Sequence, residues 1–249
     1  MKSGLNLFKK IGLTDYIEKR SFKMIRSFYI AAKDLKAEFR TKQMLNSMFI
    51  YSLLVLVVFS ISFGDFLGDS SKVEKLAPGV LWIAFTFAGM LGLSRTFVME
   101  TENGCLEALM LCPVDRGAIY TGKILSNLAI VFLMEAVTLP FFIILFNYSL
   151  GTGTLLLLLL ILFLGTFGFI AVGTLLSALT LGTRTRELLL PVILLPVLLP
   201  VLIPAVEATA GVLAGKSIGD LLPELRLLAV YDLVFFVISR LVFEYVVSD

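Results

Sequence analysis

The stretch ETENGCLEALMLCPVDRGAIYTGK, residues 100–123, is a polar segment between two long apolar runs. A helix needs about 20 mostly apolar residues to cross the hydrocarbon core of a bilayer. The whole chain is 58% hydrophobic and 16% charged with a mean hydropathy of +0.97, far from the composition of a soluble domain. We therefore expect an all-α integral membrane protein in which residues 100–123 form a loop on one side of the membrane.

Six apolar stretches around this loop are long enough to span a bilayer. They cover residues 44–64, 77–99, 124–147, 154–180, 187–206 and 225–247. Sixteen lysines and arginines flank these spans on the side of residues 100–123, and four flank them on the other side. Because basic residues accumulate on the cytoplasmic side, this predicts a cytoplasmic loop and two cytoplasmic termini.

Residues 22–43, which precede the first span, are predicted to form an amphipathic interfacial helix. The apolar residues Phe22, Ile25, Phe28, Tyr29, Ala32, Leu35 and Phe39 recur at helical spacing among basic residues. Such a helix lies in the headgroup layer with its basic residues toward anionic lipid. A soluble helix bound to a partner protein is the alternative, and residues 1–21 are interpreted as an extension without a strong period.

Residue types exclude several kinds of site. The chain has no histidine, which removes the commonest metal ligand and the usual general base, so we expect no metal site and no catalytic residues. Cys105 and Cys112 lie seven residues apart and are interpreted as reduced packing residues. The net charge of +2 gives no reason to expect a nucleic-acid partner. AGVLAGKS at 210–217 resembles a nucleotide-binding loop, but it follows a proline-rich apolar span instead of a strand, so we reject it.

The polar segment itself is predicted to contain a short helix. Asn103 caps it, Leu106, Leu109 and Met110 form an apolar stripe, and Pro113 ends it. The carboxylates of Glu100, Glu102 and Glu107 favour the positive end of its dipole. An amphipathic helix on the cytoplasmic face suits a groove on another protein, and an ordinary loop helix lying on the bundle is the alternative.

Four of the charged residues within the predicted spans are candidates for polar groups inside the membrane. They are Glu135, Asp232, Arg240 and Glu244. Because an ionised side chain in hydrocarbon is costly, we expect Glu135 or Glu244 to pair with Arg240. The prolines of the fifth span predict a bend or break there, followed by a short or re-entrant extracytoplasmic helix pair over residues 205–224.

About residues 24–248 resemble the CcmB family, the membrane subunit of the cytochrome c maturation (haem exporter) ABC complex. The landmarks are Pro78-Gly79, Trp82, Leu93-Ser94-Arg95, Glu100, Glu102-Asn103-Gly104, Leu109, Pro113-Val114-Asp115-Arg116, Lys123, Glu135 and Pro140. The resemblance implies a non-catalytic, six-helix permease of the bacterial inner membrane. It also implies a homodimer with two copies of the ATPase subunit CcmA, working with CcmC, CcmD and the haem chaperone CcmE.

On this resemblance, residues 100–116 correspond to a coupling helix that responds to a motor on another chain. The ATPase-coupling residues implied are Glu100, Glu102, Asn103, Gly104, Leu106, Leu109, Met110, Pro113, Asp115 and Arg116. ATP would be bound by the partner subunit, and haem would be a substrate and not a resident cofactor. Two alternatives remain open: an ion-coupled secondary transporter using Glu135, Asp232 and Arg240, and a purely structural assembly subunit.

Overall fold

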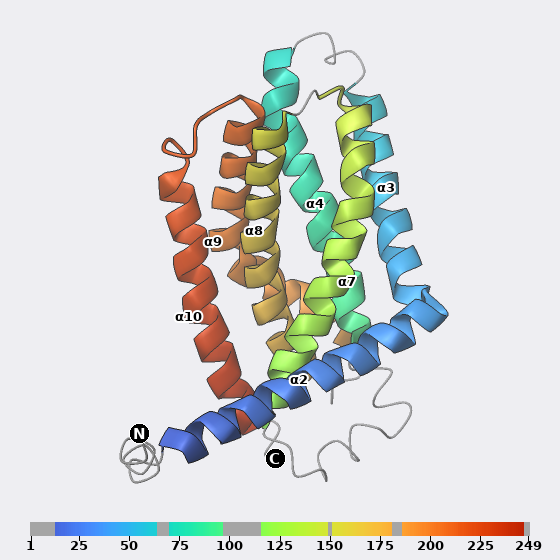
Figure 1. The fold of residues 1–249 in the computed structure, drawn as a ribbon. Helices are drawn as coiled ribbons and strands as arrows, with labels where there is room; N and C mark the ends of the chain where they lie inside the picture. The colour runs from blue at the N-terminus through green and yellow to red at the C-terminus, as the bar shows by residue number, and fades with distance from the viewer. Residues whose placement is uncertain (1–12, 64–69, 97–115, 149–150, 181–185, 247–249) are drawn as a thin grey trace.

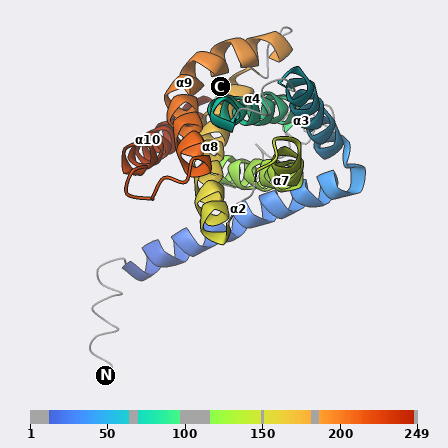
Figure 2. The ribbon, with the colours of Figure 1, turned by 90° about the horizontal axis from the view of Figure 1, so that it is seen from above.

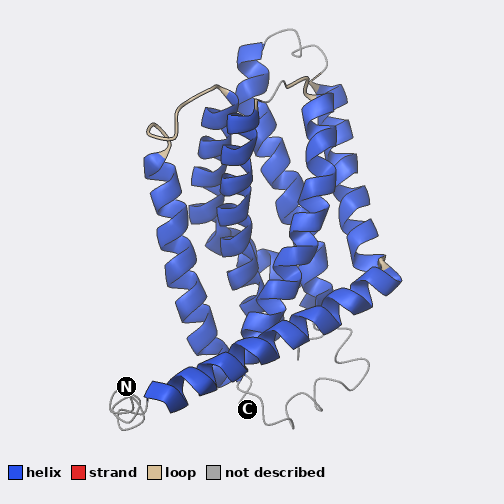
Figure 3. Cartoon of the chain, in the orientation of Figure 1, coloured by secondary structure: helices blue, strands red, loops and turns tan. Residues whose placement is uncertain are grey.

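The computed structural model of the chain describes residues 13–63, 70–96, 116–148, 151–180 and 186–246. Figure 3 draws these residues as helices joined by short loops, which confirms the all-helical prediction. α2 (Leu13–Thr41) crosses one end of a bundle formed by the other described helices (Figure 1). These are α3 (Gln43–Ser62), α4 (Ser70–Thr96), α7 (Arg116–Leu145), α8 (Thr152–Leu179), α9 (Arg186–Leu213) and α10 (Leu222–Val246).

Five of the described helices are long and apolar enough to cross a membrane. These candidate spans are Gln43–Ser62, Lys75–Thr96, Arg116–Leu145, Thr152–Leu179 and Leu188–Leu213. α10, at 25 residues, is also long enough to cross a membrane, but it carries five charged residues and is not among these five. The chain is thus a multi-pass membrane protein.

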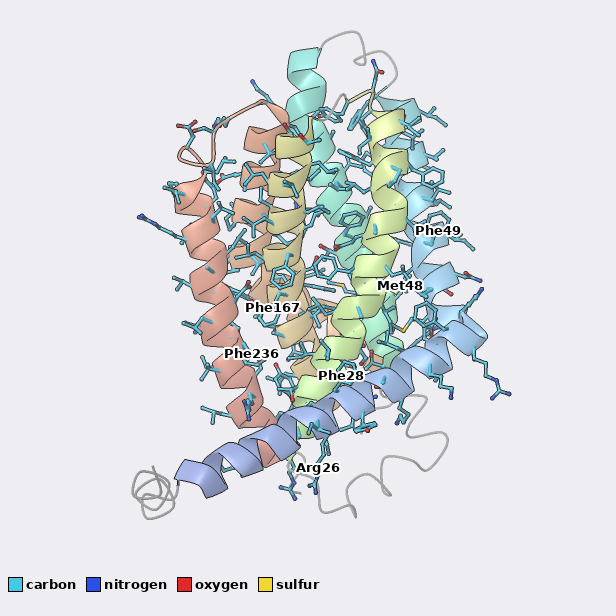
Figure 4. All side chains as sticks on the ribbon, viewed as in Figure 1. Arg26, Phe28, Met48, Phe49, Phe167 and Phe236 are labelled. Atoms are coloured by element: carbon cyan, nitrogen blue, oxygen red, sulfur yellow. The ribbon has the colours of Figure 1, made fainter. Side chains whose placement is uncertain are left out.

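α8 lies at the centre of the bundle, in contact with α4, α7, α9 and α10 (Figure 2). A Cβ atom on Gly165 would lie 2.1 Å from the Trp82 ring of α4, and one on Gly173 would lie 2.3 Å from Leu93. Glycines at these two positions let large side chains of α4 reach the α8 backbone. Phe167 of α8 and Phe236 of α10 pack together on another side, with ring centroids 5.6 Å apart (Figure 4).

α9 corrects the prediction for residues 205–224. It runs as one helix to Leu213 through all four of its prolines, and α10 begins at Leu222, so no separate helix pair forms between them. Figure 2 shows that the first turns of α9 run across the bundle axis before the helix turns along it. The lost proline donors therefore bend the helix without ending it, and Thr209 and Tyr231 donate hydrogen bonds to its Ala205 and Val197 carbonyls.

Residues 210–217 contain the C-terminal end of α9 and the turn after it, which is consistent with rejecting them as a phosphate-binding loop. Gly215 has a φ of 77°, Lys216 N–H donates to the Gly211 carbonyl at 2.9 Å, and Gly215 N–H donates to Val212 at 3.0 Å. This pair of bonds around a left-handed glycine is a Schellman motif, which ends a helix and leaves carbonyl groups at the turn. A phosphate loop instead precedes a helix N-terminus and offers N–H groups.

Candidate functional site

α2 has an exposed apolar face and a second face that contacts α7, and the sequence predicted only the first. Most of the expected apolar stripe is exposed on the described part of the helix, with Phe28 at 66% and Tyr29 at 71%, whereas Leu35 packs partly against the core. Arg26 extends away from the bundle (Figure 4). The second face, which includes Ser27, Ala31 and Asp34, is directed at the start of α7. Helical spacing of three to four residues places these positions on one side of α2.

A buried ion pair joins this second face to α7. Lys123 is 1% exposed, and its Nζ lies 2.8 Å from Oδ2 of Asp34. Ser126 Oγ lies 3.4 Å from the same carboxylate oxygen, and Lys33 Nζ lies 3.5 Å from the other one. A lysine withdrawn from water needs such a partner, since an unpaired buried charge is strongly destabilising.

The two helix backbones approach closely beside this ion pair. Ser27 Oγ donates to the Ala118 carbonyl at 2.9 Å and lies 2.7 Å from Thr121 Oγ1. A Cβ atom on Gly122 would lie 2.9 Å from the Ser27 carbonyl oxygen and 2.9 Å from Cβ of Ile30. A glycine is therefore required at position 122 for α2 to rest on α7 at this distance.

The other end of α2 is held by its turn into α3. Lys42 has a left-handed backbone with a φ of 52°, and the chain turns there from the direction of α2 into the bundle (Figure 1). Oε1 of the buried Glu38 accepts a hydrogen bond from the Leu45 N–H at 2.9 Å, which satisfies an otherwise open donor at the start of α3. α2 is thus fixed to the bundle at two points.

A polar network continues from this junction into the bundle. Thr96 Oγ1, at the end of α4, donates to Asn127 Oδ1 of α7 at 2.9 Å. Asn127 Nδ2 in turn donates to Thr174 Oγ1 of α8 at 3.1 Å. Ser177 of α8 donates to the Leu93 carbonyl of α4 at 2.7 Å. α4, α7 and α8 are therefore joined by directional bonds next to the helix that crosses them.

The two helix ends that flank the predicted coupling residues lie at this same end of the molecule. α4 ends at Thr96 and α7 begins at Arg116, both near α2 (Figure 1), and Arg116 is exposed. The remaining residues of the set, Glu100, Glu102, Asn103, Gly104, Leu106, Leu109, Met110, Pro113 and Asp115, lie outside the described residues. The junction of α2 with α7 therefore begins within a few residues of the C-terminal end of residues 97–115.

The prediction names Glu135 or Glu244 as the partner of Arg240, and the Glu135 alternative does not form. Glu135, 1% exposed, accepts a hydrogen bond at 2.6 Å from Thr166 of α8, and its Oε2 has no partner. Glu135 lies 19 residues from the start of α7, about 28 Å along the axis, whereas Arg240 lies about 9 Å from the end of α10. The two residues occupy different depths, and the side chain of Glu244 lies outside the described part of the chain.

Asp232 is brought close to α8 and not to Arg240. Its Oδ1 is buried without a hydrogen-bond partner and lies 2.4 Å from the position that a Cβ of Gly168 would take. The sequence stripe of Asp232, Arg240 and Glu244 thus does not form one cluster within the described residues. Helical spacing defines a face but not the depth or the neighbour that each residue meets.

Comparison with known proteins agrees with this architecture. The model of the CcmB protein family matches residues 25–247. The heme exporter protein B of Rhodobacter capsulatus is 32% identical over 146 residues, which cover 58% of this chain and 65% of that protein. That of Pseudomonas aeruginosa is 29% identical over 169 residues, covering 67% and 73%.

The heme exporter protein B of Escherichia coli K12 is 28% identical over 94 residues, which cover 38% of this chain and 41% of that protein. The aligned part thus spans less than two thirds of the Rhodobacter and Escherichia relatives. The family match, in contrast, extends from the middle of α2 to the end of α10. The chain belongs to the CcmB protein family.

Proposed function

We propose that the chain is the transmembrane permease subunit of an ABC complex required for cytochrome c maturation. In this proposal a separate ATPase subunit, CcmA, binds and hydrolyses ATP, and the chain described here carries out no chemical step. ATP hydrolysis by CcmA moves the permease, and this movement drives either haem export or the release of the haem-loaded chaperone CcmE. Relatives that carry the name heme exporter protein B support this assignment.

The observation that carries the proposal is the buried Asp34–Lys123 pair. It fixes α2 to the first turns of α7, and α7 begins at Arg116, directly after residues 97–115. A force applied to residues 97–115 by a partner would therefore reach α7 and α2 together. It would also reach α4 and α8, because Asn127 connects both of them to α7.

The proposed arrangement in the membrane has six spans, namely α3, α4, α7, α8, α9 and α10. α10 would be about 38 Å long, enough to cross a hydrocarbon core of about 30 Å despite its charged residues. α2 would lie in the cytoplasmic headgroup layer of the bacterial inner membrane, with both termini on that side. CcmC, CcmD and a second copy of the chain complete the proposed complex.

Haem is a transported or delivered substrate in this proposal, not a resident cofactor. The sequence contains no histidine, so imidazole ligation of haem iron would have to come from the other subunits. The chain would contribute its position and movement, and the partner ATPase would hold ATP. An ion-coupled transporter, built on the buried Glu135 and Asp232, remains the competing hypothesis.

The proposal predicts that the apolar stripe of residues 106–109 binds the ATPase. The double variant Leu106→Ser, Leu109→Ser, in complex with CcmA, CcmC and CcmD, is expected either to lose CcmA or to retain it with ATP hydrolysis that no longer releases haem-loaded CcmE. The measurements are co-purification of the subunits, ATPase rate and CcmE release.

A matched control is available on α8. Leu156 and Leu159 have the same spacing and the same residue type and are exposed on the bundle surface, so Leu156→Ser, Leu159→Ser should leave CcmA binding and release unchanged. Wild-type behaviour of the 106–109 variant would remove the coupling assignment. Haem delivery to CcmE that persists without ATP but stops when the proton gradient is dissipated would favour the ion-coupled transporter.

A further inference from the structure

A charged pocket lies at the end of the bundle opposite α2. It has a volume of about 390 Å³ and is formed by the start of α4, the last turns of α9, the connection after α9 and the first turn of α10. Two lysines, Lys75 and Lys216, and two glutamates, Glu207 and Glu224, face it. Its floor is lined by small residues, including Gly211.

The four charged side chains do not neutralise one another. No ion pair joins them among the described residues, although all four line the same pocket. Oε2 of Glu224 is buried and has no hydrogen-bond partner, whereas Lys75, Glu207 and Lys216 are exposed. A buried acceptor without a partner is costly, so this arrangement is suited to a ligand that supplies a donor to it.

The local backbone holds Lys216 at this pocket. The left-handed Gly215 turns the chain back, and the missing side chain of Gly211 leaves room for Cδ of Lys216, which lies 3.2 Å from where a Cβ would be. Ser217 then donates through its hydroxyl and its N–H to Asp220, at 2.7 and 3.1 Å. The ammonium group of Lys216 is thus presented by a structured turn.

The depth of the pocket corresponds to the headgroup layer of a bilayer. Lys75 is the first residue of the apolar stretch of α4, and Leu213 is the last residue of that of α9. Exposed apolar side chains lie beside the charged ones, at Leu76, Ile203 and Leu227. Polar headgroups begin where these apolar stretches end, and the acyl chains would cover the exposed side chains.

We propose that this pocket binds the zwitterionic headgroup of a phospholipid with a primary ammonium group, of the phosphatidylethanolamine class. Lys75 and Lys216 donate to the phosphate, and the ammonium donates to the carboxylates of Glu207 and Glu224. A purely anionic headgroup would leave both carboxylates beside negative charge. A choline headgroup has no N–H to donate, so the pocket discriminates between the two zwitterions.

The test uses the full chain, delipidated in detergent and offered phosphatidylethanolamine, phosphatidylcholine or phosphatidylglycerol, with bound lipid detected by native mass spectrometry. Phosphatidylethanolamine should bind at least about tenfold more tightly than the other two, since charge-assisted hydrogen bonds are the strong ones. Glu207→Gln with Glu224→Gln should abolish this preference, and Lys75→Gln with Lys216→Gln should abolish retention of phosphatidylethanolamine.

Arg226→Gln is the matched control, because Arg226 is exposed on the same turn of α10 and does not line the pocket. It should bind phosphatidylethanolamine as wild type does. Equal retention of all three lipids by the wild type would overturn the proposal. An undiminished preference for phosphatidylethanolamine in Glu207→Gln with Glu224→Gln, or undiminished retention in Lys75→Gln with Lys216→Gln, would also overturn it. Displacement of the lipid by soluble phosphoethanolamine at similar concentration would assign the site to a free zwitterion and overturn the lipid source.

Discussion

Lys123→Ala is expected to destabilise the docking of α2 on α7 by about 1–3 kcal/mol, because Asp34 loses its main partner but stays partly exposed and beside Lys33. The substitution leaves Asp34 facing the bundle without its 2.8 Å partner and opens space at a position that is 1% exposed. Ser126 and Lys33 contact the same carboxylate but at 3.4 and 3.5 Å, so they replace the lost bond poorly. Hydrogen exchange of the α2 amides in nanodiscs measures the effect, with faster exchange expected along residues 27–38.

Two variants separate charge from packing in this prediction. Asp34→Leu combined with Lys123→Met removes both charges and retains most of the volume, and should restore protection of α2. Lys33→Ala removes a cation that is half exposed, and should cost less than about 1 kcal/mol. Unchanged exchange of α2 in Lys123→Ala would show that the ion pair does not hold the junction together.

Gly165→Ala is expected to destabilise the bundle by about 1–3 kcal/mol. The added Cβ would lie 2.1 Å from Cη2 of Trp82, and the indole is not free to move aside because its Nε1 donates to Thr209 of α9 at 3.0 Å. α8 must therefore separate from α4, or the Trp82–Thr209 bond must break. Thermal unfolding of the purified chain in detergent, followed by tryptophan fluorescence of its single Trp, measures both effects.

Gly79→Ala provides the control for this substitution. Gly79 also lies inside a helix of the bundle, α4, but no atom lies within 4 Å of the position its Cβ would take. Alanine should therefore be tolerated there or should stabilise the helix by about 0.5–1 kcal/mol. An unfolding temperature of Gly165→Ala at or above that of Gly79→Ala would contradict the close packing of α8 on Trp82.

Apolar run length predicted most of the architecture, because the bilayer requires continuous helices of known length. A helix corresponds to each of the six predicted stretches, and most helix ends lie within a few residues of the predicted ends. The exceptions are the start of α4, the start of α7 and the end of α9, which extend further than the predicted apolar stretches. α2 also extends further than expected, from Leu13, so residues 13–21 continue the helix. Hydropathy marks only the apolar part of a helix, so it does not show where a helix with polar ends stops.

The docking face of α2 escaped prediction for a physical reason. Periodicity identified the apolar stripe with Phe28 and Tyr29, but the contact with α7 is made by Ser27 and Asp34, which are polar. Two carboxylates four residues apart, Asp34 and Glu38, among the basic residues of 22–41 were the available signal. The partner of Asp34, Lys123, is distant in sequence, and the partner of Glu38 is a backbone group, the Leu45 N–H. Helical spacing reveals neither partner.

Two departures of the structure from the sequence predictions share a cause. The Glu135–Arg240 pair and the helix pair at residues 205–224 were both inferred from the cost of a polar group in hydrocarbon. The structure accommodates each group locally, with a Thr166 hydroxyl at Glu135 and a bent but continuous α9 around its prolines. Local accommodation of this kind depends on neighbouring helices, which the sequence does not place.

The most direct measurement of the central claim is the amount of haem-loaded CcmE released per ATP hydrolysed by the purified complex. We expect Lys123→Ala to retain CcmA but to release about tenfold less CcmE per ATP, and Asp34→Leu with Lys123→Met to restore the wild-type ratio. A wild-type ratio in Lys123→Ala, measured in complexes where hydrogen exchange shows α2 detached, would contradict a role for the junction of α2 and α7 in coupling.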